Sequence, residues 1–176
     1  INDQTTLDVA LQLSPTMAGV PGDDGLTRCI KFEVFSDCVQ TPLVFEENVT
    51  FGGLFDLTGK VSTSIKIPSA GQFECITARD QLHTLRSCYT FGPADCDENG
   101  VLNAVFKGDP FFGGNWLVGG NLDGFKKENP NASHDVIDIL DFGQFVAQFG
   151  WQGDPNTPCG TQGPHADING DGSVDA

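Results

Sequence analysis

The stretch Thr5-Thr6-Leu7-Asp8-Val9-Ala10-Leu11-Gln12-Leu13-Ser14 decides the fold, because a large apolar side chain recurs at every second position from Leu7 to Leu13. A period of two places the apolar side chains on one face of a β-strand and the polar ones on the other. The same alternation recurs at 30–34 and 61–67, and further strand-like runs lie at 44–51, 73–79, 85–91 and 101–106. Clusters of Gly, Pro, Asp and Asn separate these runs. We therefore predict a mainly β fold, an antiparallel β-sandwich of about seven strands.

The chain of 176 residues is strongly acidic, with 24 Asp and Glu against 9 Lys and Arg and a formal net charge of −15. Nucleic acids and anionic membrane surfaces attract clustered Lys and Arg, which this composition does not favour. No apolar run approaches the roughly 18 to 20 residues that cross a bilayer. We expect no nucleic-acid partner and no membrane insertion. Because the sequence starts at Ile1 and its only methionine is Met17, we also expect a processed segment.

The cysteine pattern favours disulfides over a metal or haem site. There is no C-x-x-C motif, so zinc-ribbon, thioredoxin-like and haem-attachment sites lose the spacing that they need. An even number of cysteines in an acidic, Gly-rich chain indicates disulfides formed in an oxidising compartment, rather than free buried thiols. The spacing leaves the pairing open, and Cys88 with Cys96 is attractive only because a turn lies between them. The candidates are Cys29, Cys38, Cys75, Cys88, Cys96 and Cys159.

Two Asn-x-Ser/Thr sequons, at Asn48 and Asn131, are candidates for glycosylation. Together with the expected disulfides they fit a protein surface outside the cytoplasm. We predict an exported protein, extracellular or at the cell surface.

The sequence changes character after Gly108. The stretch Asp109-Pro110-Phe111-Phe112-Gly113-Gly114-Asn115 predicts a linker or loop, so we divide the chain into a sandwich at 1–112 and a second module at 113–176. In that module the segment 139–149 predicts a helix, which Asp138 can cap and Gly150 can end. Its apolar side chains recur at helical spacing and are Ile139, Phe142, Phe145, Val146 and Phe149.

The sharpest chemical signal is the string Asp167-Ile168-Asn169-Gly170-Asp171-Gly172-Ser173-Val174-Asp175. A calcium loop needs side-chain oxygens at positions 1, 3 and 5, a glycine at 6, a backbone carbonyl at 7, an oxygen at 9 and an acid at 12. The residues that fill these positions, up to position 9, are Asp167, Asn169, Asp171, Gly172, Ser173 and Asp175. Position 12 would fall at residue 178, so the sequence predicts a truncated loop. The alternative is an Asp/Asn/Gly turn without a metal.

An interrupted copy of the loop lies upstream. Asn121 and Asp123 match its first half, and an insertion at about 125–133 separates them from the second half. There the carbonyl of Val136 takes position 7, Asp138 takes position 9 and Asp141 takes position 12. The alternative is that Asp138 and Asp141 only cap the helix. In paired loops of this kind the apolar residues at position 8, here Ile137 and Val174, lie where one loop pairs with the other.

Paired loops of the form D-x-N-x-D-G-x-V-D, with a short helix after each, resemble the type I dockerin module over residues 119–176. The stretch from Cys75 to Arg86 (Cys-Ile-Thr-Ala-Arg-Asp-Gln-Leu-His-Thr-Leu-Arg), followed by Gly119-Gly120-Asn121-Leu122-Asp123, is also similar to uncharacterised exported bacterial proteins that place a β-sandwich before a dockerin-like tail. The dockerin resemblance implies Ca²⁺-dependent folding and protein–protein assembly. It implies no catalysis.

Two other polar groups have competing interpretations. The acidic run 95–100 imitates the start of a calcium loop, but Asn99-Gly100 favours a turn between the strands at 85–91 and 101–106, which predicts a hairpin. The group formed by Arg79, Asp80, His83 and Arg86 could do acid–base work, but a salt bridge at a corner of the sandwich is favoured.

These patterns lead to three hypotheses for function. The first is a non-catalytic, exported, calcium-binding structural or assembly protein of a surface layer, filament or multiprotein complex, in which the apolar helix face packs on the sandwich or on a neighbouring subunit. The alternative is a carbohydrate-binding module of a secreted polysaccharide-degrading system, which predicts a row of exposed aromatic side chains on a sheet face. The third, a hydrolase that uses Asp80 and His83, has the least support because no second constellation accompanies this pair.

Overall fold

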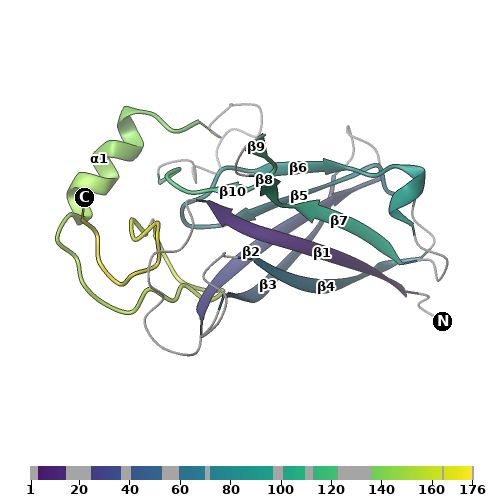
Figure 1. Cartoon of the computed structure of the whole chain (residues 1–176), viewed down its shortest axis with the longest axis horizontal. Helices are drawn as coiled ribbons and strands as arrows, with labels where there is room; N and C mark the ends of the chain where they lie inside the picture. Colours follow the sequence, from purple (N-terminus) through teal and green to yellow (C-terminus); the bar gives the residue numbers. More distant parts are fainter. Residues whose placement is uncertain are drawn as a thin grey trace.

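The computed structural model describes residues 4–14, 25–36, 41–52, 60–69, 72–96, 101–109, 113–122, 136–163 and 165–175. Over these residues the chain is mainly β, with a single α-helix near its C-terminal end (Figure 1). In chain order the elements are β1 (Gln4–Ser14), β2 (Leu26–Phe35), β3 (Leu43–Phe51), β4 (Lys60–Pro68), β5 (Cys75–Asp80), β6 (Ser87–Thr90), the 3-10 helix η1 (Pro93–Asp95), β7 (Leu102–Phe106), β8 (Gly108–Asp109), β9 (Gly113–Gly114), β10 (Leu117–Val118) and α1 (Ile139–Gln148).

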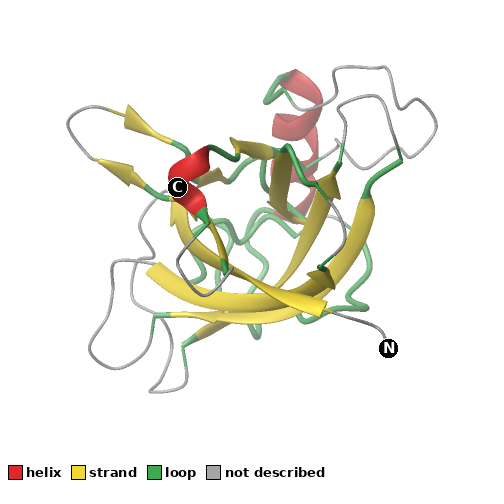
Figure 2. Ribbon diagram, turned by 90° about the vertical axis from the view of Figure 1, so that its right-hand side faces the viewer, coloured by secondary structure: helices red, strands yellow, loops and turns green. Residues whose placement is uncertain are grey.

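Two sheets face each other across the core (Figure 2). One has the strand order β3-β2-β5-β6 and is antiparallel throughout. The other is built on β1, which pairs antiparallel with β4 but parallel with β7 and β10. The predicted mainly β fold is therefore confirmed, and each of the seven predicted segments forms a strand. The parallel pairs of β1 are the exception to the expected antiparallel order.

The core follows from the alternation along β1. Leu7, Val9 and Leu11 are fully buried between the sheets, and they share one cluster with Phe32 of β2 and Phe106 of β7. A shift of the register by one residue would turn the whole apolar set of β1 to the outside, so burial of this face fixes the pairing.

The predicted hairpin between 85–91 and 101–106 is not formed. β6 pairs with β5 in one sheet, whereas β7 pairs with β1 in the other. The buried side chains of Ala104 and Phe106 explain this, because pairing with β1 puts them into the core and satisfies the backbone of β7. The chain crosses between the sheets through η1 and a bridge from Cys96 to Leu102, and the turn residues 97–100 lie outside the described residues.

Strands of the sandwich occur on both sides of the predicted boundary at residue 112. β8 and β9 pair within the stretch expected to be a linker, and β10 pairs with the end of β1 at Leu13 and Ser14. Leu117 of β10 is fully buried in the core. Strands of two residues are too short to show a periodic pattern, which is why the sequence did not predict them.

The C-terminal segment covers the end of the sandwich at which β1 ends and β2 begins (Figure 1). A disulfide joins Cys29 of β2 to Cys159 across 130 residues. Next to it, Thr157 N donates to Thr27 O (2.9 Å) and Cys29 N donates to Thr157 O (3.0 Å). A cross-link of this span stabilises a fold by about 5 kcal/mol in the chain-entropy picture. The segment is thus fastened to β2 both covalently and through its backbone.

The other cysteines only partly follow the expectation. Cys88 is exposed and carries a free thiol, so the pair of Cys88 with Cys96 is not formed. The alternation of β6 accounts for this, because Tyr89 packs against the core and its neighbour Cys88 therefore faces outward. Cys75 is buried on β5, and Cys38 lies outside the described residues.

The predicted helix is confirmed as α1, together with its caps. Asp138 accepts a hydrogen bond from Leu140 N (2.7 Å), and Asp141 accepts one from Asp138 N (2.7 Å), which completes a capping box. Gly150 follows the helix with a φ of +84°, a conformation that favours glycine. The apolar face, however, does not pack on the sandwich as one alternative expected. Ile139 is 74% exposed and Phe142 is 58% exposed.

We predict that Phe106→Ala lowers the free energy of unfolding by about 3–5 kcal/mol, because it leaves a cavity where both sheets meet. Val105→Ala, at the neighbouring exposed position, should change it by less than about 0.5 kcal/mol. Urea unfolding followed by intrinsic fluorescence measures both. Equal losses for the two variants would contradict the assigned register of β7.

Candidate functional site

Asp167 organises the C-terminal loop by accepting three hydrogen bonds from the backbone. Its Oδ1 accepts from Gly170 N (2.9 Å) and Asp171 N (3.2 Å), and its Oδ2 accepts from Gly172 N (2.9 Å). Gly170 and Gly172 have φ values of +72° and +85°, which let the chain curl around the carboxylate. The residue predicted at position 1 is therefore the buried centre of a tight turn.

The other predicted oxygen donors form a continuous chain of hydrogen bonds. Asp171 Oδ1 accepts from both the N and the Oγ of Ser173 (2.9 Å each), and Asp171 Oδ2 accepts from Asn169 Nδ2 (2.9 Å). Asp175 Oδ2 lies 3.0 Å from the same Ser173 Oγ, whose single proton can be donated to one of the two carboxylates at a time. Partial burial acts to raise the pKa of Asp171, but the bonds from Ser173 and Asn169 outweigh it, so this pKa is lowered. The carboxylate of Asp171 is therefore ionised at neutral pH.

The loop pairs with the segment that follows α1. Val174 N donates to Trp151 O (3.0 Å), and Gly153 N donates to Gly172 O (3.0 Å). These two bonds lie on either side of the antiparallel pair of Gln152 and Ser173. The backbone of Ser173 therefore takes no part in this ladder, which leaves its carbonyl oxygen, the calcium ligand expected at position 7, unused.

Val174 does not pair with Ile137, the matching described residue of the other predicted loop, since its backbone N–H and C=O bond to Trp151 and Gly150. It is 1% exposed, whereas Ile137, the matching residue of the upstream copy, is 47% exposed. Because the backbone of Val174 bonds to the segment after α1 instead, the side chain enters a small second core. The members of that core are Leu122, Ala166, Val174, Phe145 and Trp151.

The upstream copy is brought together in part. Asp141, which is buried, accepts from Leu122 N (2.6 Å) as well as from Asp138 N, so the end of the predicted loop meets its beginning beside Asn121. Val136 is exposed, and Asp123 lies outside the described residues. The capping role expected as the alternative for Asp138 and Asp141 is present in the structure.

The donor chemistry of the loop 167–175 fits a hard cation. All of its candidate donors are oxygens, the ligand type that Ca²⁺ and Mg²⁺ take in proteins. Among the described residues, no ion pair involves Asp167, Asp171 or Asp175. No three His, Cys, Asp or Glu side chains converge there into a preformed metal-binding cluster. To bind a cation, the carboxylates of Asp171 and Asp175 would have to give up hydrogen bonds that they now accept from Ser173 and Asn169.

A buried arginine lies behind the loop. Arg28 of β2 has no exposed surface, and its Nη2 donates to the backbone oxygen of Asp167 (3.0 Å). Its Nη1 donates to Thr157 Oγ1 (2.9 Å), and its Nε lies 3.8 Å from Asp80 Oδ2. A buried charge is tolerated only where partners of this kind replace its hydration. Arg28 therefore links β2, β5, the loop and the segment around Thr157 and Cys159 that is fastened to β2.

Asp80 and His83 form the rest of this buried cluster. His83 Nε2 lies 3.0 Å from Asp80 Oδ2, and Leu82 N and Thr84 Oγ1 hold the Asp80 carboxylate and backbone N–H in place. Burial lowers the pKa of His83 to about 4, against the opposing effect of Asp80 and with the help of Arg28. His83 is therefore neutral at pH 7.

The polar group expected at the sandwich corner is divided between two faces. Asp80 and His83 turn inward, where Asp80 pairs with Arg28 and lies beside the neutral His83, whereas Arg86 Nε lies 3.6 Å from Glu33 on the outer side of its sheet. Arg28 was not predicted, although a signal existed. Ile30 and Phe32 belong to the inner face of β2, and extending their alternation by two residues places Arg28 on that face as well.

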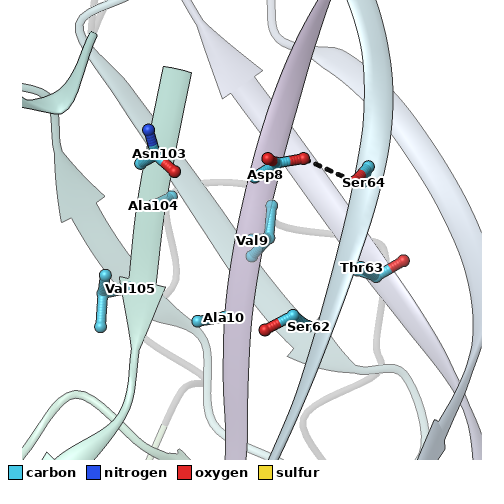
Figure 3. A pocket seen from close by; sticks show the side chains of 9 residues that line it. All are labelled: Asp8, Val9, Ala10, Ser62, Thr63, Ser64, Asn103, Ala104 and Val105. Atoms are coloured by element: carbon cyan, nitrogen blue, oxygen red, sulfur yellow. Dashed lines mark hydrogen bonds between the residues drawn. The ribbon is translucent and has the colours of Figure 1, made fainter. Parts of the chain in front are cut away.

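An open depression of about 320 Å³ lies on the outer face of β4, β1 and β7 (Figure 3). Small outward side chains such as Ala10 and Ser62 leave room there, and Ser64 Oγ donates to Asp8 Oδ1 (2.5 Å) at its edge. Asp8 is the single titratable side chain among the lining residues, so the depression lacks the paired groups that acid–base catalysis needs.

The sequon at Asn48 has a structural role. Its Oδ1 accepts a hydrogen bond from Cys159 N (2.7 Å), which supports the disulfide-linked segment, and its side chain is exposed on β3. Asn131 lies outside the described residues. Glycosylation at either position stays a prediction.

Comparison with known proteins gives no relative from which a function could be transferred. The chain matches no protein-family model, no curated protein and no solved structure. In the described part of the chain, no helix is long and apolar enough to cross a bilayer.

We predict that stability falls as the pH drops from about 6.5 towards 4, partly because of His83. Its pKa is lower in the folded state than the ordinary value of 6.5, so the unfolded chain binds a proton in this range that the folded chain does not. His83→Gln should show a smaller loss of melting temperature between pH 7.5 and pH 4.5 than the wild type. An equal loss of melting temperature in the two proteins over this pH range would contradict the buried, neutral state of His83.

Proposed function

We propose that this protein is a non-catalytic, exported, calcium-binding protein that serves as a structural or assembly subunit of a surface layer, filament or multiprotein complex. The observation that carries the proposal is the loop 167–175, in which oxygen donors in the order of a calcium loop surround the buried Asp167. The disulfide between Cys29 and Cys159 supports the exported location, because such bonds persist in oxidising compartments.

In this proposal the cation is held by the side chains of Asp167, Asn169 and Asp171, the carbonyl of Ser173, and Asp175 either directly or through water. Bound calcium supplies positive charge to carboxylates that otherwise repel one another. Asp167 needs little rearrangement, since three backbone N–H groups already orient its carboxylate. Because the loop is also tied to the segment after α1, calcium binding adds to the stability of the folded chain.

The apolar face of α1 is the proposed contact surface for a protein partner or a second copy. Large exposed apolar patches on a protein surface mark interaction sites. The one charged residue within α1 is Asp141, and its side chain is buried, so the face carries little of the repulsion expected of a chain with a net charge of −15. The side chains that are more than half exposed are Ile139, Leu140, Phe142, Val146 and Phe149.

The loop and the helix are physically connected. Phe145 of α1 packs in the same small core as Val174 of the loop, and Trp151, just after the helix, bonds to the backbone of Val174. A cation that rigidifies the loop therefore also fixes the orientation of α1. This is the step by which calcium would control assembly.

The alternative functions have less support. A carbohydrate-binding module needs aromatic side chains in a row on a sheet, but no aromatic residue lines the depression of Figure 3. Among the described large apolar residues that are exposed, the aromatic ones are Phe142 of α1 and Phe149 just after it. A hydrolase based on Asp80 and His83 would need a route for substrate, yet at most 1% of either side chain is exposed.

We predict that millimolar calcium raises the melting temperature of chelator-treated protein by roughly 5 °C or more, provided that calcium exceeds the Kd about 100-fold. Asp171→Asn removes one donor charge and should reduce this shift. Glu46→Gln removes a charge from the exposed surface of β3 and should keep it. An unchanged melting temperature of the wild type in calcium would contradict the metal-binding proposal.

We also predict that calcium promotes association through α1. Sedimentation velocity should show larger species in calcium than in chelator, and Phe142→Ser with Val146→Ser should abolish them. Val105→Ser changes an exposed apolar residue on the sheet and is the matched control. Identical sedimentation of all three proteins, with and without calcium, would contradict self-assembly through this face.

A further inference from the structure

The contacts between the loop and the sandwich converge on one end of β2. Arg28 bonds to the backbone oxygen of Asp167 and to Thr157, while Leu26, on the same face of the strand, touches the loop at Gly170. We propose that Arg28 is a positioning residue for the calcium loop: its guanidinium holds the backbone of Asp167 against β2, so that cation binding and folding of the sandwich are coupled. This inference rests on the proposed calcium-binding function.

The shape of the guanidinium suits this role. Its planar fork directs Nη1 to Thr157, which lies in the segment fastened to β2, and Nη2 to Asp167, the first residue of the loop. A lysine offers a point charge on a flexible stem and could not hold both partners in a fixed geometry. One rigid group therefore sets the distance between the fastened segment and the loop.

The backbone and the side chain of Asp167 have different hydrogen-bond partners. Its backbone oxygen accepts from Arg28, while its carboxylate accepts from the amides at 170, 171 and 172. Arg28 therefore anchors the residue and leaves the remaining acceptor capacity of the carboxylate to a cation.

The negative charge of Asp80 offsets the positive charge of Arg28, which would otherwise repel a cation bound to the loop. Its carboxylate lies 3.8 Å from Arg28 Nε in the same buried space, so the pair presents little net positive charge to an entering cation. The effect of Arg28 on the loop is therefore mainly the order that it imposes. A loop that is already ordered binds more tightly, because less conformational entropy is lost on binding.

Close packing provides a second contact. A Cβ added to Gly170 would lie 2.6 Å from Leu26 Cδ2, so the loop backbone rests directly on β2. Leu26 and Arg28 thus hold the loop at two points, and a change in either the loop or the strand is transmitted to the other.

The test is calcium titration by calorimetry on chelator-treated protein, at a temperature well below each melting point. Arg28→Met keeps an unbranched apolar stem and removes the donors. It should weaken calcium binding by about tenfold or more, which corresponds to the loss of one hydrogen bond made by a charged group. Thr157→Val removes one acceptor of Arg28 and should weaken binding less. Where Arg28→Met alone does not fold, Arg28→Met with Asp80→Asn removes both buried charges together and replaces it.

The matched control is Ile76→Ala, a substitution on β5 in the large core cluster, which is separate from the small core that contains Val174 of the loop. It should lower the melting temperature and leave the Kd for calcium unchanged. Hydrogen exchange of the amides at 170 and 172 in chelator should be faster in the Arg28 variant than in this control.

Three results would overturn the inference. Unchanged Kd values in both the Arg28 and the Thr157 variants would show that the anchor does not affect the site. A loss of affinity in Ile76→Ala equal to that in Arg28→Met would show a general effect of stability. A wild-type protein that binds no calcium would contradict the proposed function and, with it, this inference, whereas the first two results leave the proposed function intact.

Discussion

Arg28 carries a positive charge into the buried interior on the inner face of β2, and the C-terminal segment supplies both of its hydrogen-bond acceptors. The fully buried guanidinium needs partners to replace its lost hydration, and one alone would not suffice. Asp80 supplies the opposite charge, Thr157 supplies a hydroxyl, and Asp167 supplies a carbonyl. Two of the three come from the segment that covers the open end of the sandwich. Arg28 therefore helps to fix the position of that segment, and the disulfide at Cys29 holds the segment next to β2.

This arrangement makes a chain of contacts from the core to the helix. The core fixes β2, β2 holds Asp167 through Arg28, and Asp167 shapes the loop with its carboxylate. The loop then pairs with the segment after α1, where Val174 shares a small core with Phe145. Each step joins groups with little freedom, because it uses buried side chains or paired backbone. A cation in the loop would act at the middle of this chain, with the sandwich on one side and the exposed face of α1 on the other.

The sequence predicted the features that repeat or that follow a known order. Alternation located three of the seven main strands, and strand-like runs between clusters of turn residues located the other four. The spacing from Asp138 to Gly150 located α1 with its caps. The features it missed depend on contacts between distant residues. The parallel pair of β1 with β7, and the two-residue strand β10 at Leu117, leave no local pattern. Arg28 could have been found from its register, but its partners Thr157 and Asp167 lie more than a hundred residues away. The order of donors from Asp167 to Asp175 was readable, whereas the choice of Trp151 as the backbone partner of Val174 was not.

The negative net charge of the chain explains why calcium, in the proposed function, would promote association rather than oppose it. With a net charge of −15, separate copies repel one another, and the screening length at physiological ionic strength is only about 8 Å. Repulsion is therefore weakest where a surface has no charge of its own and where bound cations neutralise the nearest carboxylates. The exposed face of α1 meets the first condition, and the loop beside it would meet the second when calcium is bound. Under the proposed function, an acidic protein with an apolar helix next to a cation loop would stay dispersed in chelating conditions and would associate in calcium. In that proposal the carboxylates that repel other copies would also supply the ligands for the calcium that lets the copies associate.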